Sequence, residues 1–155
     1  MPALEELISG APLFAGLAPS QVELIAGCAR NEHVDGGTFL LREGEPADRF
    51  YLIRDGAVAL EVHAPGRGPI VIETLGAGDV VGWSWLFAPY RWQLDGRAIE
   101  PTGLVAFDGV CLRGKCEADH ELGYQLMSRF AATIVDRLQA TRFQLLDVYG
   151  HAHAG

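Results

Sequence analysis

The sequence lacks the features of a membrane or secreted protein. No stretch approaches the roughly 20 consecutive apolar residues that cross a bilayer. The N-terminal segment has neither the basic start nor the continuous apolar core of a signal peptide. We therefore expect a cytoplasmic protein without a membrane partner.

Basic residues are also scarce. The chain has 12 Lys and Arg against 20 Asp and Glu, a formal net charge of -8, and its cations are scattered singly. Proteins that bind a nucleic-acid backbone normally present a basic face or stripe. We therefore expect no nucleic-acid partner.

The chain is poor in cysteine and lacks a recognisable catalytic motif. Its three cysteines, Cys28, Cys111 and Cys116, show no metal-ligand spacing. In a reducing compartment we expect them to remain thiols. Cys28 is expected in the core, and the other two are either structural or exposed and reactive. Because no serine, cysteine or histidine has the spacing of a nucleophile and its base, the sequence predicts a non-enzymatic protein without a metal site.

What the sequence does contain is a series of short apolar runs separated by glycines. Between residues 34 and 87, apolar and aromatic runs end at or near glycines, which is typical of strands joined by tight turns. The length of 155 residues and the 49% hydrophobic content suit a single domain with one core. The sequence therefore predicts a mainly β fold.

Several of these motifs resemble the cyclic nucleotide-binding domain of catabolite-activator regulators, regulatory kinase subunits and nucleotide-gated channels. The matching segments are Gly44-Glu45, Phe50-Tyr51-Leu52-Ile53, Gly56 and Gly78-Asp79-Val80-Val81-Gly82. The resemblance implies a double-stranded β-helix, that is, a jelly-roll-like β-roll, with N-terminal helices and a long C-terminal dimerisation helix. It covers most of the chain, so we expect one domain over residues 1–155.

The resemblance also implies the internal organisation of this domain. The expected segments are N-terminal helices in 1–30, a β-roll in 31–108 with a phosphate-binding cassette near 82–97, a short helix in 109–118 and the long helix in 119–149. In transcriptional members of the family a winged DNA-binding domain would follow the long helix. The sequence leaves no room for one, so we expect a stand-alone domain.

The cassette departs from the family pattern. In the family, its last glycine is followed by a Glu for the ribose and, further on, by an Arg for the cyclic phosphate. Here Trp83 follows Gly82, and no Arg stands at the expected spacing. Because a misplaced cation does not replace a bidentate Arg–phosphate contact, we expect weak or altered binding of cyclic AMP, cyclic GMP or another anion. The candidate ligand-binding residues are Gly82, Trp83, Ser84, Arg91, Arg97 and Thr141.

All three tryptophans of the chain lie in this cassette region. Two interpretations remain open for Trp83, Tyr90 and Trp92. These side chains either pack into the protein, with Trp83 filling the hollow left by the absent Glu and ligand, or form an aromatic pocket or protein-contact patch. Trp85 is expected in the core.

The C-terminal segment predicts a long helix with a heptad seam. From about residue 119 to 149 there is no proline, and apolar positions recur in steps of four and three. The seam, which we expect to form a homodimer, contains Met127, Ala131, Ile134, Leu138, Thr141 and Leu145. In the family, the equivalent helix forms the symmetric dimer interface, although such a face can also pack on its own domain. Thr141 either donates to a ligand or bonds to its own helix.

Two functions follow from these observations. The first is a sensor that binds a ligand weakly and transmits its occupancy through the C-terminal helix. The second is a ligand-free homodimeric adaptor, or an accessory subunit of a larger complex, as stand-alone members of the family are beside redox enzymes. The missing Glu and Arg favour the adaptor.

Overall fold

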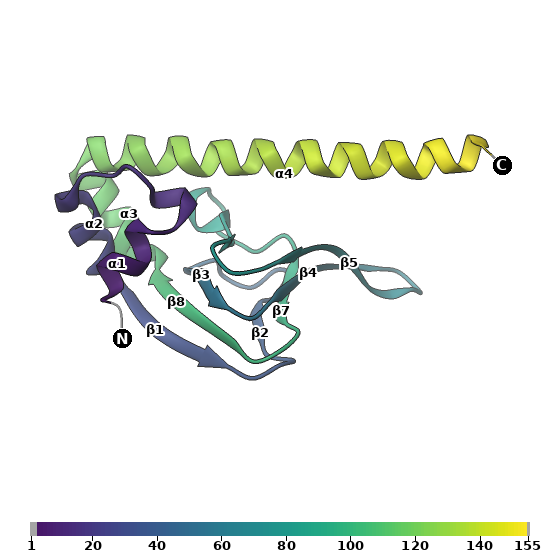
Figure 1. Cartoon of the computed structure of the whole chain (residues 1–155), viewed down its shortest axis with the longest axis horizontal. Helices are drawn as coiled ribbons and strands as arrows, with labels where there is room; N and C mark the ends of the chain where they lie inside the picture. Colours follow the sequence, from purple (N-terminus) through teal and green to yellow (C-terminus); the bar gives the residue numbers. More distant parts are fainter. Residues whose placement is uncertain (1–2, 155) are drawn as a thin grey trace.

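The computed structural model describes residues 3–154, and the side chains of residues 143–145 and 147–154 lie outside that description. Figure 1 shows a β-roll with short helices at one end and one long helix, α4, running along its side. The helices are α1 Leu4–Ser9, α2 Pro19–Ala26, α3 Gly109–Ala118 and α4 His120–Ala154, with 3-10 turns at Pro12–Phe14 and Ser84–Leu86. The strands are β1 Ala29–Val34, β2 Phe39–Leu41, β3 Arg49–Asp55, β4 Val58–Ala64, β5 Gly68–Leu75, β6 Val80–Val81, β7 Asp95–Ala98 and β8 Thr102–Asp108.

The strands form two antiparallel four-stranded sheets. Their orders are β1-β8-β3-β6 and β2-β7-β4-β5. Gly56, in the tight turn between β3 and β4, has a φ of 94°, which glycine adopts without the steric cost of a Cβ. The two sheets, the flanking helices and the long C-terminal helix confirm the predicted fold class.

The N-terminal helical region is shorter than expected. Helix α2 begins with Pro19 in its first turn, a position that suits proline, and ends at Ala26 with Gly27 as its C-cap. Arg30, which we assigned to the helical segment, instead pairs with Ala106 in the ladder between β1 and β8. That backbone pairing overrides the short helical pattern at this end.

An aromatic stack joins the roll to the helices. Phe50 stacks on Phe107 and Trp85, with ring centroids 4.4 and 4.6 Å apart, and Phe130 of α4 meets Phe50 edge-on at 5.4 Å. Trp85 is fully buried, as predicted. Together with buried Leu122 and Leu126, Phe130 fixes the first half of α4 against its own domain.

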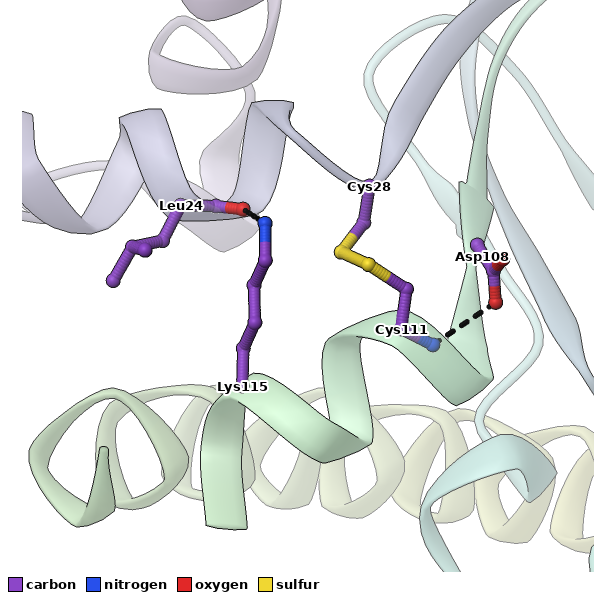
Figure 2. The surroundings of a disulfide bond; sticks show 5 residues. All are labelled: Leu24, Cys28, Asp108, Cys111 and Lys115. Carbon is purple, nitrogen blue, oxygen red and sulfur yellow. Dashed lines mark hydrogen bonds between the residues drawn. A yellow bond between two sulfur atoms is a disulfide. The ribbon is translucent and has the colours of Figure 1, made fainter. Parts of the chain in front are cut away.

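The cysteines differ from our expectation, because Cys28 and Cys111 form a disulfide (Figure 2). They are 83 residues apart in the sequence, but their Cα atoms lie 5.9 Å apart. The reason is topological: Cys28 precedes β1, β1 pairs with β8, and α3 begins directly after β8. Cys116 is a free thiol.

No helix among residues 3–154 is both long enough and apolar enough to cross a membrane. Over the same described range, no three or more His, Cys, Asp or Glu side chains gather in a way that could hold a metal ion.

Candidate functional site

The candidate site lies where β6 runs into the cassette. Gly82 follows β6 directly and has a φ of 96°, in the region that favours glycine. A Cβ at this position would lie 2.6 Å from the Cη2 atom of Trp92. Glycine is therefore required here both for the backbone turn and for the close approach of the Trp92 ring.

Trp92 fills the inner end of the site. Its side chain is 6% exposed and packs in the inner core of the roll with Leu41 and Leu60. Its backbone is held by the loop before β3, because Trp92 N–H donates to Glu45 O at 3.1 Å and Trp92 O accepts from Gly44 N–H at 2.9 Å. The ring is thus fixed from both its side chain and its backbone.

Little space remains between these groups. The cavity has a volume of about 30 Å³, whereas small-molecule pockets usually measure about 300–1,000 Å³. Its lining residues are Leu41, Leu60, Gly82, Trp83, Ser84, Trp92, Leu94 and Arg137. We call Trp83 and Trp92 the aromatic plug, since their rings stand in the wall of this small cavity.

Arg137 of α4 closes the outer side of the cavity. Its guanidinium donates from Nη2 to Val80 O at 2.6 Å, and its carbon Cζ lies 5.0 Å from the centroid of the Trp83 ring. Glu73 lies 3.9 Å away, and the Arg137 side chain is 13% exposed. Burial lowers the pKa of Arg137, while Glu73 and Asp79 oppose that shift. An arginine remains charged under such a shift, so Arg137 links α4 to the cassette as a cation.

The two cations that we proposed for an anion site are engaged elsewhere. Arg97 donates from Nε and Nη2 to the two carboxylate oxygens of buried Glu61, each at 3.0 Å. Arg91 donates to Gly44 O at 2.9 Å. Neither lines the small cavity. Thr141 donates its hydroxyl to Arg137 O within its own helix at 2.9 Å.

Of the candidate ligand-binding residues, the structure therefore brings together Gly82, Trp83 and Ser84, and it places Arg91, Arg97 and Thr141 outside that cavity. Sequence reasoning missed the contact of Arg137 with the cassette. The signal was its position in the predicted long helix, four residues before the candidate residue Thr141.

A second cavity of about 320 Å³ lies between the turn before β6 and α4. Its charged lining residues are Glu73, Asp79, Asp136 and Arg137. Three carboxylates against one guanidinium make this an unfavourable place for a phosphate, because like charges repel the anion.

Comparison with known proteins identifies the family. The cyclic nucleotide-binding domain profile matches residues 31–119, and the chain belongs to that family. The CRP-like cAMP-activated global transcriptional regulator of Mycobacterium tuberculosis is 26% identical over 145 residues, which are 94% of this chain and 63% of the regulator. The chain thus spans less than two thirds of that relative's length.

Solved structures share the fold. One is a Geobacter metallireducens protein named provisionally as cyclic nucleotide-binding, with a TM-score of 0.78 and 28% identity over 89% of this chain and 99% of that one. Another is the regulatory subunit of a cAMP-independent protein kinase A from Trypanosoma brucei, solved as a mutant bound to cAMP. It has a TM-score of 0.71 and 16% identity over 90% of this chain and 49% of that one, so it supports the fold alone.

Proposed function

We propose that this chain is a non-enzymatic regulatory domain whose nucleotide pocket is filled by its own side chains, and that it acts as a ligand-free homodimeric adaptor, either alone or within a larger complex. The aromatic plug is the observation that carries this proposal. A space of about 30 Å³ has room for a water molecule but not for a nucleotide.

The charges near the cassette support the same proposal. A cyclic phosphate needs a cation that is free to form charge-assisted hydrogen bonds. Arg97 already satisfies both oxygens of Glu61, which is 3% exposed, and withdrawing it would leave a buried carboxylate unpaired. Arg137 is held by Val80 O and by the Trp83 ring. The arrangement therefore favours a pocket without a bound anion.

The outer face of α4 supports the homodimer. Met127 and Leu138 of the predicted seam are 42% and 51% exposed, and Val135 beside them is 50% exposed. Ala131 is exposed and Ile134 half-buried, while the side chain of Leu145 lies outside the described residues. Apolar side chains that recur in heptad steps on an open helix face favour a second helix as the partner.

The comparisons are compatible with a ligand-free role. The Mycobacterium tuberculosis relative is named as cAMP-activated, whereas the Trypanosoma brucei subunit with the same fold belongs to a kinase named as cAMP-independent. The fold by itself therefore does not require activation by cyclic AMP.

Calorimetric titration with cyclic AMP and cyclic GMP at low salt tests whether the filled pocket excludes nucleotide. We expect no saturable heat up to millimolar nucleotide, with the Mycobacterium tuberculosis regulator as the positive control. Saturable micromolar binding would return the protein to the sensor class.

Sedimentation equilibrium tests whether the protein forms the proposed homodimer. The full chain should sediment as a dimer, and Leu138→Glu should dissociate it by placing a charge in the seam. Leu24→Glu, on an exposed position of α2, serves as the matched control and should remain dimeric. A monomeric wild-type protein would contradict the homodimer.

A further inference from the structure

The disulfide between Cys28 and Cys111 joins two parts of the chain that lie far apart in sequence. Figure 2 shows Cys28 between the end of α2 and the start of β1, and Cys111 in the first turn of α3. The N–H of Cys111 donates to Asp108 Oδ1 at 3.0 Å, which caps α3 and fixes the backbone beside the sulfur. Close by, Lys115 Nζ donates to Leu24 O at 2.6 Å. One covalent link and one hydrogen bond therefore hold α3 against α2.

The disulfide stands in the wall of a cavity of about 470 Å³. Both cysteines line it, together with Arg30, Arg49 and Val110. Cys28 is 8% exposed and Cys111 is half-buried. The volume falls within the range of small-molecule pockets, so the cavity has room for a small thiol beside the disulfide.

The disulfide holds α3, and α3 in turn packs against the start of the long helix α4. Only Asp119 separates α3 from α4, and the two helices pack tightly: a Cβ on Gly123 of α4 would lie 3.0 Å from Cys116 O of α3. Helix α4 carries Arg137, which contacts the cassette, and the exposed seam. The base of α4 is therefore the part of the long helix that a change in how α3 is held would reach first.

A disulfide is unusual in the reducing compartment that the sequence suggests, where such bonds are usually transient and redox-responsive. We propose that Cys28 and Cys111 form a thiol–disulfide exchange site, at which a low-molecular-weight thiol enters the 470 Å³ cavity and reversibly releases α3 from α2.

The exchange runs in two balanced steps. The thiolate of the incoming thiol attacks the Sγ of Cys111, the less buried of the two cysteines, forms a mixed disulfide and displaces the Cys28 thiolate, which takes up a proton. A second small thiol attacks the mixed disulfide at the small molecule's sulfur and releases Cys111 as a thiol. Two small thiols are oxidised to one disulfide, and the protein disulfide is reduced by two electrons and two protons.

The third cysteine does not supply the attacking group. Burial raises the pKa of Cys116, and the carboxylates of Asp119 and Glu117 add to the shift. The thiolate is the nucleophile in exchange, so Cys116 is a poor internal competitor at neutral pH. The thiol that opens the bond therefore comes from solution.

Thiol labelling in reduced and oxidised glutathione buffers tests the site on the folded full chain. Cys116→Ser removes the background thiol and keeps the disulfide. In this variant we expect no label in oxidised glutathione, two labels in reduced glutathione without denaturant, and full reversal on reoxidation. Labelling of both cysteines in the oxidised buffer, or reduction only after unfolding, would overturn the proposal.

Hydrogen exchange tests the release of α3. Reduction of Cys116→Ser, or the change Cys28→Ser, should lower amide protection in α2, α3 and the start of α4, while the far strands β4 and β5 stay unchanged. Equal amide protection in the oxidised and reduced forms would show that breaking the disulfide does not loosen α3, and would overturn the proposed release of α3.

A bulky side chain at the cavity mouth tests the route of entry. Val110 lines the cavity and is 57% exposed, so Val110→Trp should slow reduction by glutathione severalfold. Val71→Trp, at a position on β5 that is 52% exposed and outside the cavity, is the matched control and should leave the rate unchanged. Equal rates in the two variants would exclude entry through this cavity.

Discussion

Trp92→Ala is expected to destabilise the β-roll and to open the space beside Gly82. The Trp92 side chain is 6% exposed and belongs to the inner core. Truncating a buried Trp to Ala typically costs about 3–5 kcal/mol, because apolar contacts are lost and a cavity remains. We expect a loss of about 4 kcal/mol, near the middle of that range, which corresponds to a fall of roughly a thousandfold in the folding equilibrium constant.

Urea unfolding followed by circular dichroism measures this loss. The midpoint should fall while the slope with denaturant stays the same, since the surface exposed on unfolding changes little. Trp83→Ala is the matched control within the aromatic plug. Trp83 is only half-buried, so its removal should cost less than the removal of Trp92.

Addition of indole to the Trp92→Ala variant separates a true cavity from general loosening. An apolar cavity left by a truncated side chain binds small aromatic molecules, so indole should raise the melting temperature of the variant and not that of the wild-type protein. A loss of stability within about 0.5 kcal/mol, as is typical of surface positions, would refute the assignment of Trp92 as a buried plug.

Three further predictions concern charged and titrating groups. Arg137→Met should lower the free energy of unfolding by about 1–3 kcal/mol in urea unfolding, since it removes a charged donor to Val80 O; an unchanged stability would contradict a contact that anchors α4. Arg97→Met should lower the melting temperature measured by calorimetry, because Glu61 is left buried and unpaired. The double variant Arg97→Met with Glu61→Leu should recover most of the lost melting temperature. Equal melting temperatures in the single and double variants would contradict the cost of an unpaired Glu61. Because the pKa of Cys116 is raised, the rate of its alkylation should begin to rise at a higher pH than the rate for an exposed cysteine. A rate that already levels off at neutral pH would contradict the raised pKa.

The fold could be predicted because its signals are local. Gly56, Gly78 and Gly82 mark turns at which φ is positive, and the apolar runs between such turns match the strands. The long helix was visible in its heptad pattern, although it extends to Ala154, past the expected end at residue 149. The end of α2 was missed because the pairing of β1 with β8 is a long-range interaction.

The candidate site was predictable only in part. The absence of the family's Glu and Arg can be read directly from the sequence. Whether Trp92 packs inward depends instead on the backbone geometry beside Gly82, which residue spacing does not predict. The disulfide was missed for a similar reason, since 83 residues separate two cysteines that become neighbours only after β1 and β8 pair.

The most direct test of the aromatic plug is nuclear magnetic resonance of the three tryptophan indole N–H groups in ¹⁵N-labelled protein. Trp92→Phe would assign the resonance of Trp92. Our account predicts that this resonance does not move when cyclic AMP or cyclic GMP is added to millimolar concentration. A saturable shift of the Trp92 resonance would show that the nucleotide displaces or contacts the ring, and would contradict a pocket filled by the protein itself.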